Sequence, residues 1–551
     1  TTTGRFALAD EYTAKALQLR EEKLGNTNMA VAASLNNYAV LHYNLGKYNE
    51  SEKEFNDAIA VIKTNKLQEA MPYAIVLNNQ AMLYQSMGNY EAAVKVLLQA
   101  MTLSAKLESA KARNQLKFLS NLALLYQQMG KYAEAEKIYL ELDKKLDKGK
   151  PEQANMLNNY AILSLLMKKE DKVESMLKQS TGIYKSSMGE SSPAYAKVIS
   201  DLGNFYRHKA RYAEAEPLLQ QALQIREEVL GTNHPMYVQS QEDLALLHWK
   251  QKDFTTSISL YKTVMEKTLD FINSYFAPMS EAEKTRYWDM LAPRFQRFYN
   301  IGLDAASPDK GILKDMFECR TATKGILLSS TRKISESISN SGNQQLIDDY
   351  TNWIDHKEQL TKLYAYSKQD LKEQAVNIDS LEANVNSMEK KISKNSKEFA
   401  DFYFAGKIKF NAIQNQLKGD EALVEIIRLQ QFEQGFTDDC RYIGLVATKD
   451  KSQPEIVVLD KGNDLEVKHA RTYRVMMKSK GNDVQSYTNF WEPFEKELSG
   501  KKTIYVSLDG VYNQVNLNTL KKTGNDYLIK KYDFILLSNP RDIMASNKNG
   551  K

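Results

Sequence analysis

The sequence predicts a mainly α-helical protein in which a helical solenoid is followed by a helical linker and a smaller, layered α/β domain. A Gly-x-aromatic signature recurs every 42 residues in the first part of the chain, and such a fixed period is typical of stacked helical repeats. Apolar residues then follow a heptad pattern over 371–392, which indicates a long helical hairpin. From about residue 420 the apolar period becomes strand-like. We therefore expect a solenoid at 1–265, a linker at 266–414 and an α/β domain at 415–551.

Each unit of the solenoid reads as a helix, a tight turn and a second helix, because apolar residues at helical spacing precede and follow the signature. Glycine suits the turn, since it readily adopts the left-handed conformation that ends a helix. The first unit has only its second helix, so we expect the natural protein to extend upstream of residue 1. The signature glycines and, after a four-residue contraction, the residues that replace them are Gly4, Gly46, Gly88, Gly130, Lys168, Ala210 and Lys252.

These units resemble the tetratricopeptide repeat (TPR). The 42-residue period and the connector LGTNHP at 230–235 are similar to the long-helix variety found in kinesin light chains. Six full units and one leading half unit carry the resemblance. It implies an α-solenoid that binds a protein or peptide in its concave groove.

One position in the first helix of each full unit carries a carboxamide or a carboxylate. Such side chains compete for backbone hydrogen bonds and are poor helix-interior residues, so something other than helicity favours them here. The resemblance implies that this helix lines the concave face, where a ladder of polar groups would grip the backbone of an extended peptide. An equally weighted alternative is that these groups bond the neighbouring repeat across the helix stack. The predicted partner-binding residues are Asn37, Asn79, Asn121, Asn159, Asp201 and Asp243.

The linker keeps a helical pattern but loses the 42-residue register. Its aromatic residues, such as Trp288 and Phe295, are predicted to pack in a core, and Pro278 and Pro293 are predicted to break helices. The heptad positions further on are too few to require an intermolecular coiled coil, so we predict an intramolecular hairpin over 355–400. These heptad positions are Leu371, Ile378, Val385 and Ile392, with Leu381 and Met388 at the complementary position.

The last part of the chain alternates short apolar runs with helical segments, which favours a layered α/β domain. Helices are predicted near 464–478 and 484–498. Strands are predicted at 422–428, 442–447, 456–459, 503–508 and 534–537.

This series resembles the opening half of the CHAT domain, a caspase-like module that often follows tetratricopeptide repeats. The resemblance covers residues 415–545, and the preceding segment KGILLSS at 324–330 is similar to the linker of such proteins. Leu508 stands where many relatives have Pro, and Asn516-Leu517 where they often have Pro-Phe, which indicates a subfamily. The segments that carry the resemblance are ALVEIIR, YIGLVA, IVVL, FWEPFEKELSGKKTIYVSLDGVYNQVNLNTL and DYLIKKYDFILLSNPRDI.

The resemblance implies a three-layer domain of a clan CD cysteine endopeptidase, in which a His and a Cys attack a peptide carbonyl. In the family both residues follow the segment that corresponds to Ser538-Asn539-Pro540, within His-Gly and Ser-Ala-Cys motifs. Neither motif occurs in this chain, so no catalytic residue is assigned. We expect the missing part of the domain to be a separate polypeptide bound alongside, or to have been lost beyond the polar tail at 545–551.

The leading functional hypothesis is therefore the regulatory and N-terminal part of a TPR-CHAT hydrolase. Relatives in bacterial defence release the protease when a partner engages, and it then cleaves a protein substrate. The alternative is a non-catalytic scaffold that binds peptides or proteins through its concave groove.

Other Cys and His residues give weaker patterns. Cys440 with His469 is in the reverse order to the family, and Cys319 with His356 lies in helical linker sequence, so structural roles are favoured for both pairs. Asp509-Gly510 reads as a strand-end turn. No ligand spacing suggests a metal, and no glycine motif suggests a cofactor.

Composition sets the remaining limits. A formal charge of +5 over 551 residues is too small to argue for a nucleic-acid partner. Two cysteines indicate a reducing, cytoplasmic location, and no apolar run is long enough to span a membrane.

Overall fold

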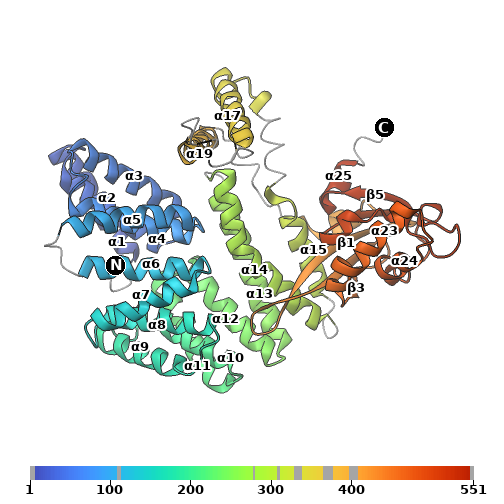
Figure 1. Cartoon of the computed structure of the whole chain (residues 1–551), viewed down its shortest axis with the longest axis horizontal. Coiled ribbons are helices and arrows are strands. Elements are labelled where there is room, and N and C mark those ends of the chain that lie inside the picture. Colours follow the sequence, from blue (N-terminus) through green and yellow to red (C-terminus); the bar gives the residue numbers. More distant parts are fainter. Residues whose placement is uncertain are drawn as a thin grey trace. The chain divides into compact units, whose positions relative to one another are not determined.

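The computed structural model describes residues 6–107, 113–276, 279–306, 311–327, 338–363, 371, 377–395 and 408–546. The chain forms two compact units, Thr1–Met290 and Leu291–Lys551 (Figure 1). The predicted features at Gly4, Pro278, 328–330 and 547–551 lie outside the described residues.

The first unit is a stack of antiparallel helix pairs (Figure 1). Small residues at the helix crossings let the helices approach closely: Ala81 and Ala93 are buried, and a Cβ on Gly203 would come within 2.9 Å of Leu219. The helices are α1 (Phe6–Leu24), α2 (Met29–Asn44), α3 (Tyr48–Thr64), α4 (Met71–Ser86), α5 (Tyr90–Lys106), α6 (Arg113–Gln128), α7 (Tyr132–Lys145), α8 (Pro151–Leu166), α9 (Val173–Met188), α10 (Pro193–His208), α11 (Tyr212–Leu230), α12 (Pro235–Lys250) and α13 (Phe254–Phe276).

The turn inside each repeat has the predicted left-handed residue, even where glycine has been replaced. Gly46 has φ 72°, and Lys168, Ala210 and Lys252 have φ between 56° and 65°. A left-handed conformation costs a residue with a Cβ about 1 kcal/mol, so the surrounding helix packing must maintain the turn in the later repeats.

Five linker helices follow in the described part of the chain: α14 (Glu281–Ala305), α15 (Ile312–Thr323), α17 (Gln344–Leu363), α19 (Ile378–Asn395) and α21 (Phe410–Gln414). The predicted break at Pro293 is wrong, because α14 continues through it. Phe295, Phe298 and Tyr299 are buried within the two turns that follow the proline, and this packing outweighs one missing backbone hydrogen bond.

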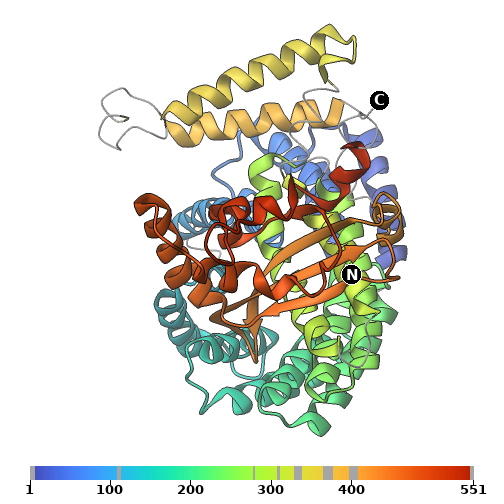
Figure 2. The same cartoon turned by 90° about the vertical axis from the view of Figure 1, so that its right-hand side faces the viewer.

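The predicted helical hairpin is confirmed, with α17 and α19 side by side (Figure 2). It begins earlier than expected, at Gln344, and the heptad residues Val385 and Ile392 lie buried in its second helix.

A five-stranded mixed sheet forms the centre of the last region, with strand order β3-β2-β1-β4-β5. The strands β1, β4 and β5 are parallel, whereas β1-β2 and β2-β3 pair antiparallel. All five predicted strands are present: β1 (Glu421–Phe432), β2 (Phe436–Thr448), β3 (Glu455–Leu459), β4 (Thr503–Ser507) and β5 (Asp533–Leu537).

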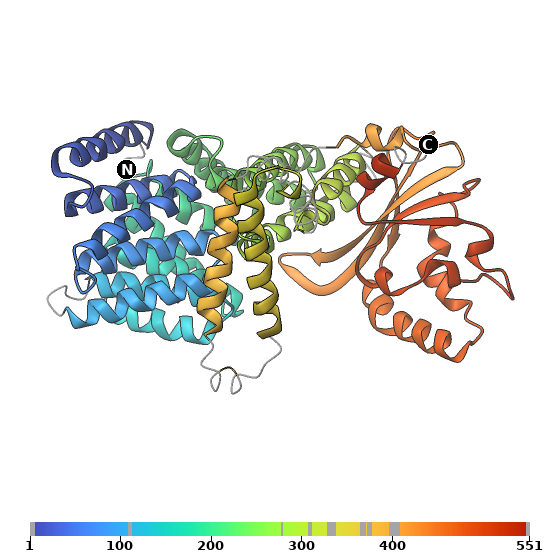
Figure 3. The same ribbon diagram turned by 90° about the horizontal axis from the view of Figure 1, so that it is seen from above.

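Helices cover both faces of this sheet (Figures 1 and 3). Val424 and Ile426 of β1 belong to a core with α23 (Ala470–Ser479) and α24 (Gln485–Phe490). On the opposite face, Glu425 bonds Arg320 of α15. The helix predicted at 484–498 ends at Phe490, because Pro493 lacks a backbone donor and disfavours helix in the preceding residue.

Within the described residues, every helix is too short or too polar to cross a bilayer.

Candidate functional site

The predicted ladder residues join successive repeats through side-chain hydrogen bonds. In each bond, a ladder residue pairs with the residue just before the ladder position in the preceding repeat, 43 positions earlier. The pairs are Asn79 Nδ2 to Asn36 Oδ1 (3.1 Å), Asn121 Nδ2 to Asn78 Oδ1 (2.8 Å), Asn158 Nδ2 to Asp201 Oδ2 (2.6 Å) and Ser200 Oγ to Asp243 Oδ2 (2.9 Å).

The hydrogen bonds between successive repeats do not occupy every polar atom of the ladder side chains. Asn37 is exposed, and Asn79, Asn121 and Asp201 are partly exposed. These four residues can still present an amide or a carboxylate to a ligand. By contrast, Asn159 and Asp243 are only 4% and 5% exposed. The groove-binding role of the ladder remains a prediction, and these four residues are its best candidates.

The ladder is interrupted where the repeat contracts. The helix α7 has 14 residues, whereas α3 and α5 have 17, and Asn159 follows Asn121 by only 38 positions. Ser120 Oγ is shielded from solvent without a hydrogen-bond partner, and Asn159 Oδ1 instead accepts a bond from Lys197 Nζ at 3.2 Å. The six-residue row is therefore two shorter rows, before and after the contraction.

The last ladder residue lies in an unusual electrostatic setting. Burial raises the pKa of Asp243 above its usual value, and the nearby guanidinium of Arg226 opposes this shift. Arg226 is itself buried, and its Nη1 donates to Ser240 Oγ at 2.6 Å. Asp243 is thus a core acid that bonds Ser200 and Gln239, and it is a poor candidate for direct ligand contact.

The first and last repeats of the solenoid touch each other. His234 Nε2 donates to the backbone oxygen of Asn44 at 2.6 Å, and its Nδ1 accepts from Met236 N at 3.0 Å. A Cβ on Gly46 would come within 2.9 Å of Pro235, and the Tyr275 hydroxyl donates to the Gly46 oxygen. Burial lowers the pKa of His234 to about 4, so the ring is neutral at pH 7. We call this set of residues the closing contact.

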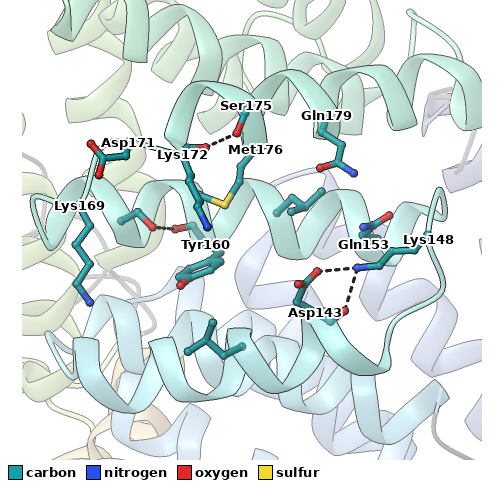
Figure 4. Close-up of a pocket in the computed structure, with 13 residues that line it drawn as sticks. Asp143, Lys148, Gln153, Tyr160, Lys169, Asp171, Lys172, Ser175, Met176 and Gln179 are labelled. Atoms are coloured by element: carbon teal, nitrogen blue, oxygen red, sulfur yellow. Dashed lines mark hydrogen bonds and ion pairs between the residues drawn. The ribbon is translucent and has the colours of Figure 1, made fainter.

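A pocket of about 570 Å³ lies between α7, α8 and α9 (Figure 4). Leu157 and Tyr160 of α8 line it, and Lys172 points toward Tyr160. At about 100° per residue, Leu157 lies about 160° and Tyr160 about 100° around the helix from the ladder residue Asn159. The rim of the pocket carries both charges, since Lys148 Nζ lies 2.9 Å from Asp143 Oδ1. The pocket is therefore separate from the ladder face.

In the second unit, the candidate Cys and His residues have structural surroundings. Cys440 is buried in β2, and burial raises the pKa of its thiol to about 11, which disfavours a thiolate nucleophile. His469 Nδ1 lies 2.9 Å from Asn489 Nδ2, and His356 Nδ1 lies 2.8 Å from the Asn352 oxygen. Across the described ranges, no group of three or more His, Cys, Asp or Glu residues is placed to hold a metal ion.

Sequence reasoning missed a buried ionic cluster that lies beside the middle of β1 and the carboxyl end of β4. Arg320 Nε and Lys324 Nζ lie 3.0 Å and 2.8 Å from Glu425 Oε1, and Glu425 has no exposed side-chain surface. Arg320 Nη2 also lies 2.7 Å from Asp509, and Lys324 Nζ donates to Ser507 Oγ at 2.6 Å. A glutamate in the middle of the apolar run ALVEII was the available signal, because a buried charge requires a partner.

Comparison with known proteins identifies the repeats. Residues 72–142 and 195–267 match one family model described as tetratricopeptide repeat, and residues 31–73 match a second with the same description. The first unit therefore contains tetratricopeptide repeats, as predicted from the sequence. None of the curated proteins compared matches the chain.

The solved structures that match this chain do so at low sequence identity. A putative kinesin light chain of Podosopora anserina with nearly identical TPR-like repeats is 22% identical over 35% of this chain and 94% of that chain, with a TM-score of 0.28. BtubC (BKLC) of P. vanneervenii is 20% identical over 42% of this chain and 93% of that chain, with a TM-score of 0.31. PilF of Pseudomonas aeruginosa is 16% identical over 48% and 97%, with a TM-score of 0.28.

Proposed function

We propose that the first unit binds a protein or peptide through its ladder face and thereby controls a cysteine endopeptidase of the TPR-CHAT type, of which this chain supplies the regulatory and N-terminal part. The observation that carries the binding role is the set of exposed or partly exposed ladder side chains: the amides of Asn37, Asn79 and Asn121 before the contraction and the carboxylate of Asp201 after it. An extended peptide offers backbone donors and acceptors at regular intervals, and such a row can bond them without reading side chains.

The sheet of the second unit supports the caspase-like part of the proposal. Its parallel strands β1, β4 and β5, covered by helices on both faces, have the layered arrangement that a CHAT half domain requires. In the described part of the chain, β5 is an edge strand, and Leu536 on it is 65% exposed. An apolar edge of this kind favours pairing with another strand. We propose that the rest of the CHAT domain provides it, as a second chain or as a continuation of this one.

A matched pair of variants tests the binding role. Peptides selected from a displayed library against the full chain provide the probe, and N37A/N79A/N121A should weaken their binding about tenfold or more through lost backbone bonds. The control N36A/N78A removes the same inter-repeat bonds but leaves Asn79 and Asn121 in place. Equal binding by N37A/N79A/N121A and the wild type, with a lower Tm, would assign the ladder to structure.

The alternative function, a non-catalytic scaffold, is separated by a protease assay. The product of the complete gene would be incubated with a proteome-derived peptide library, with and without the selected peptide, and new termini read by mass spectrometry. Cleavage that requires the peptide and is lost when the cysteine of a downstream Cys motif is replaced by alanine supports the protease. If the gene encodes neither a His-Gly motif nor a Cys motif, the non-catalytic scaffold is the supported function.

A further inference from the structure

A short helical segment of the second unit carries a net positive charge nearly as large as that of the whole chain. Residues 461–480 contain six Lys and Arg side chains and two carboxylates, a formal charge of +4, whereas the whole chain carries +5. The segment comprises α22 (Gly462–Asp464), a helical turn at Leu465–His469 and α23. Its cations are Lys461, Lys468, Arg471, Arg474, Lys478 and Lys480.

One of the two carboxylates is not available to offset these cations. Glu466 bonds Arg428 Nη2 at 3.1 Å and accepts from the Tyr442 hydroxyl at 2.7 Å, so it is engaged by strands β1 and β2. Asp464 is the other carboxylate, and it is exposed. The outward surface of the segment is therefore strongly basic.

Two valines stand exposed among these cations. Val467 is 73% exposed and Val475 is 56% exposed. The segment does not need them for its own packing, because Leu465, Ala470 and Tyr473 are the residues that it buries in the domain core. Single exposed aliphatic side chains are common on protein surfaces, but these two lie beside the same row of cations, so a partner that covers the row would also cover the valines.

The valines and cations share one side of the helix. Arg471, Arg474 and Lys478 follow the spacing i, i+3 and i+7 within α23, which places them along one line. Val467 is exposed in the π-helical turn that leads into this helix. Val475 lies beside this line. We call this surface, made of Val467, Val475, Arg471, Arg474 and Lys478, the valine-cation face.

We propose that the valine-cation face docks an acidic helix of another protein, with apolar side chains against the valines and carboxylates against the cations. The cations then pair with carboxylates, and this attraction speeds the encounter of the two proteins. The valines contact apolar side chains, which adds affinity that salt does not screen. This proposal is independent of the ladder face and of the protease.

Two other anionic partners suit the observations less well. Nucleic acid would neutralise the cations, but the two valines would gain nothing from phosphates, and the aromatic ring of the segment, Tyr473, is buried away from any base. An anionic membrane would require a free apolar face to insert, and the apolar face of α23 is already packed in the domain core.

A direct binding experiment tests the proposal on the full chain. The probe is a fluorescent amphipathic peptide of about 20 residues, with Leu on one face and Glu on the other, read by anisotropy at low salt. Both V467S/V475S and R471Q/K478Q should weaken binding about tenfold, and only R471Q/K478Q should reduce the salt dependence. The control K522Q/K530Q removes two exposed cations elsewhere on the same unit and should bind as the wild type does.

Three results would overturn the proposal. The first is no binding of the peptide at low salt, or equal binding by V467S/V475S and wild type. The second is tighter binding of a single-stranded RNA of about 20 nucleotides, insensitive to the valines, which would identify a phosphate-binding surface. The third is sedimentation with phosphatidylserine vesicles in preference to peptide binding, which would identify a membrane surface.

Discussion

At the residue scale, the carboxylate of Glu425 in the second unit is a buried charge that requires cationic partners. It lies in the central strand β1 with no exposed surface, and its Oε1 accepts hydrogen bonds from both Arg320 and Lys324. Burial lowers the pKa of Lys324, and the carboxylate opposes that shift. Because Arg320 of α15 and Lys324, the residue that follows α15, supply the cations and β1 supplies the anion, the cluster attaches a linker helix to the central strand.

Replacing one cation should therefore cost as much stability as a large truncation in the hydrophobic core. We expect K324M to destabilise the second unit by about 3 kcal/mol, since it leaves a buried carboxylate with one cationic partner fewer. Adding E425Q should recover part of this loss, because the buried charge is then removed. Urea unfolding followed by tryptophan fluorescence, to which the buried Trp491 of this unit contributes, measures both changes. A K324M/E425Q protein less stable than K324M would contradict the account.

His234 gives the solenoid a defined pH dependence. Its pKa is about 4 in the folded protein and near 6.5 in an unfolded chain, so the folded state binds the proton less readily. Above about pH 6.5, where His234 is neutral in both states, this residue does not lower the free energy of unfolding. As the pH falls from 6.5 to 4, the unfolded chain takes up the proton more readily, and the free energy of unfolding decreases by roughly 2–3 kcal/mol. The variant H234Q can donate to Asn44 and accept from Met236 without titrating.

Thermal melts between pH 7 and pH 4 therefore provide the measurement. H234Q should lose less stability than the wild type over this interval. Asp243 acts in the opposite direction, since its raised pKa favours the folded state at low pH, but it is common to both proteins. Parallel pH profiles for the two proteins would show that His234 does not titrate as proposed.

At the element scale, features that depend on neighbouring residues in the sequence were predicted correctly, whereas features that depend on contacts between distant residues were not. The repeats, the turn residues, the hairpin and the five strands depend on local periodicity and turn chemistry, which a single sequence displays. The continuation of α14 through Pro293 depends on tertiary packing that no local pattern records. The ladder bonds, the ionic cluster and the closing contact join residues 43 to 229 positions apart, and their geometry exists only in the folded chain.

The hairpin of α17 and α19 is an element whose stability can be tested by itself. Its buried residues include Leu346, Trp353 and Leu360 on α17 and Val385 on α19, and Trp353 is the largest. We expect W353A to cost about 3–5 kcal/mol locally and to open the hairpin. Hydrogen exchange should accelerate in both hairpin helices and remain unchanged in the sheet. The control D355A alters an exposed position on the same helix, and lost protection in β1 of W353A would contradict a local effect.

At the scale of the whole solenoid, the closing contact distinguishes this unit from an open stack of repeats. In an open solenoid each repeat touches only its neighbours, so the terminal repeats open first. Here the turn at Asn44–Gly46 meets His234 and Pro235, and the ring of Tyr48 packs 5.3 Å from that of Tyr275. The first full repeat thus has partners on both sides.

Removing the aromatic ring of Tyr275 should release the first repeats. Y275A loses both the hydroxyl bond to Gly46 and the ring packing, so amide exchange in α2 and α3 should accelerate about 10- to 100-fold, while α8 to α10 keep their protection. Y275F keeps the ring and should show only the smaller effect of one lost hydrogen bond, about 1 kcal/mol. Y12A, at an exposed tyrosine of α1, is the matched control. Equal acceleration in every repeat would mean that the solenoid opens as one unit, and unchanged exchange in α2 and α3 would mean that the first repeats are held without the closing contact.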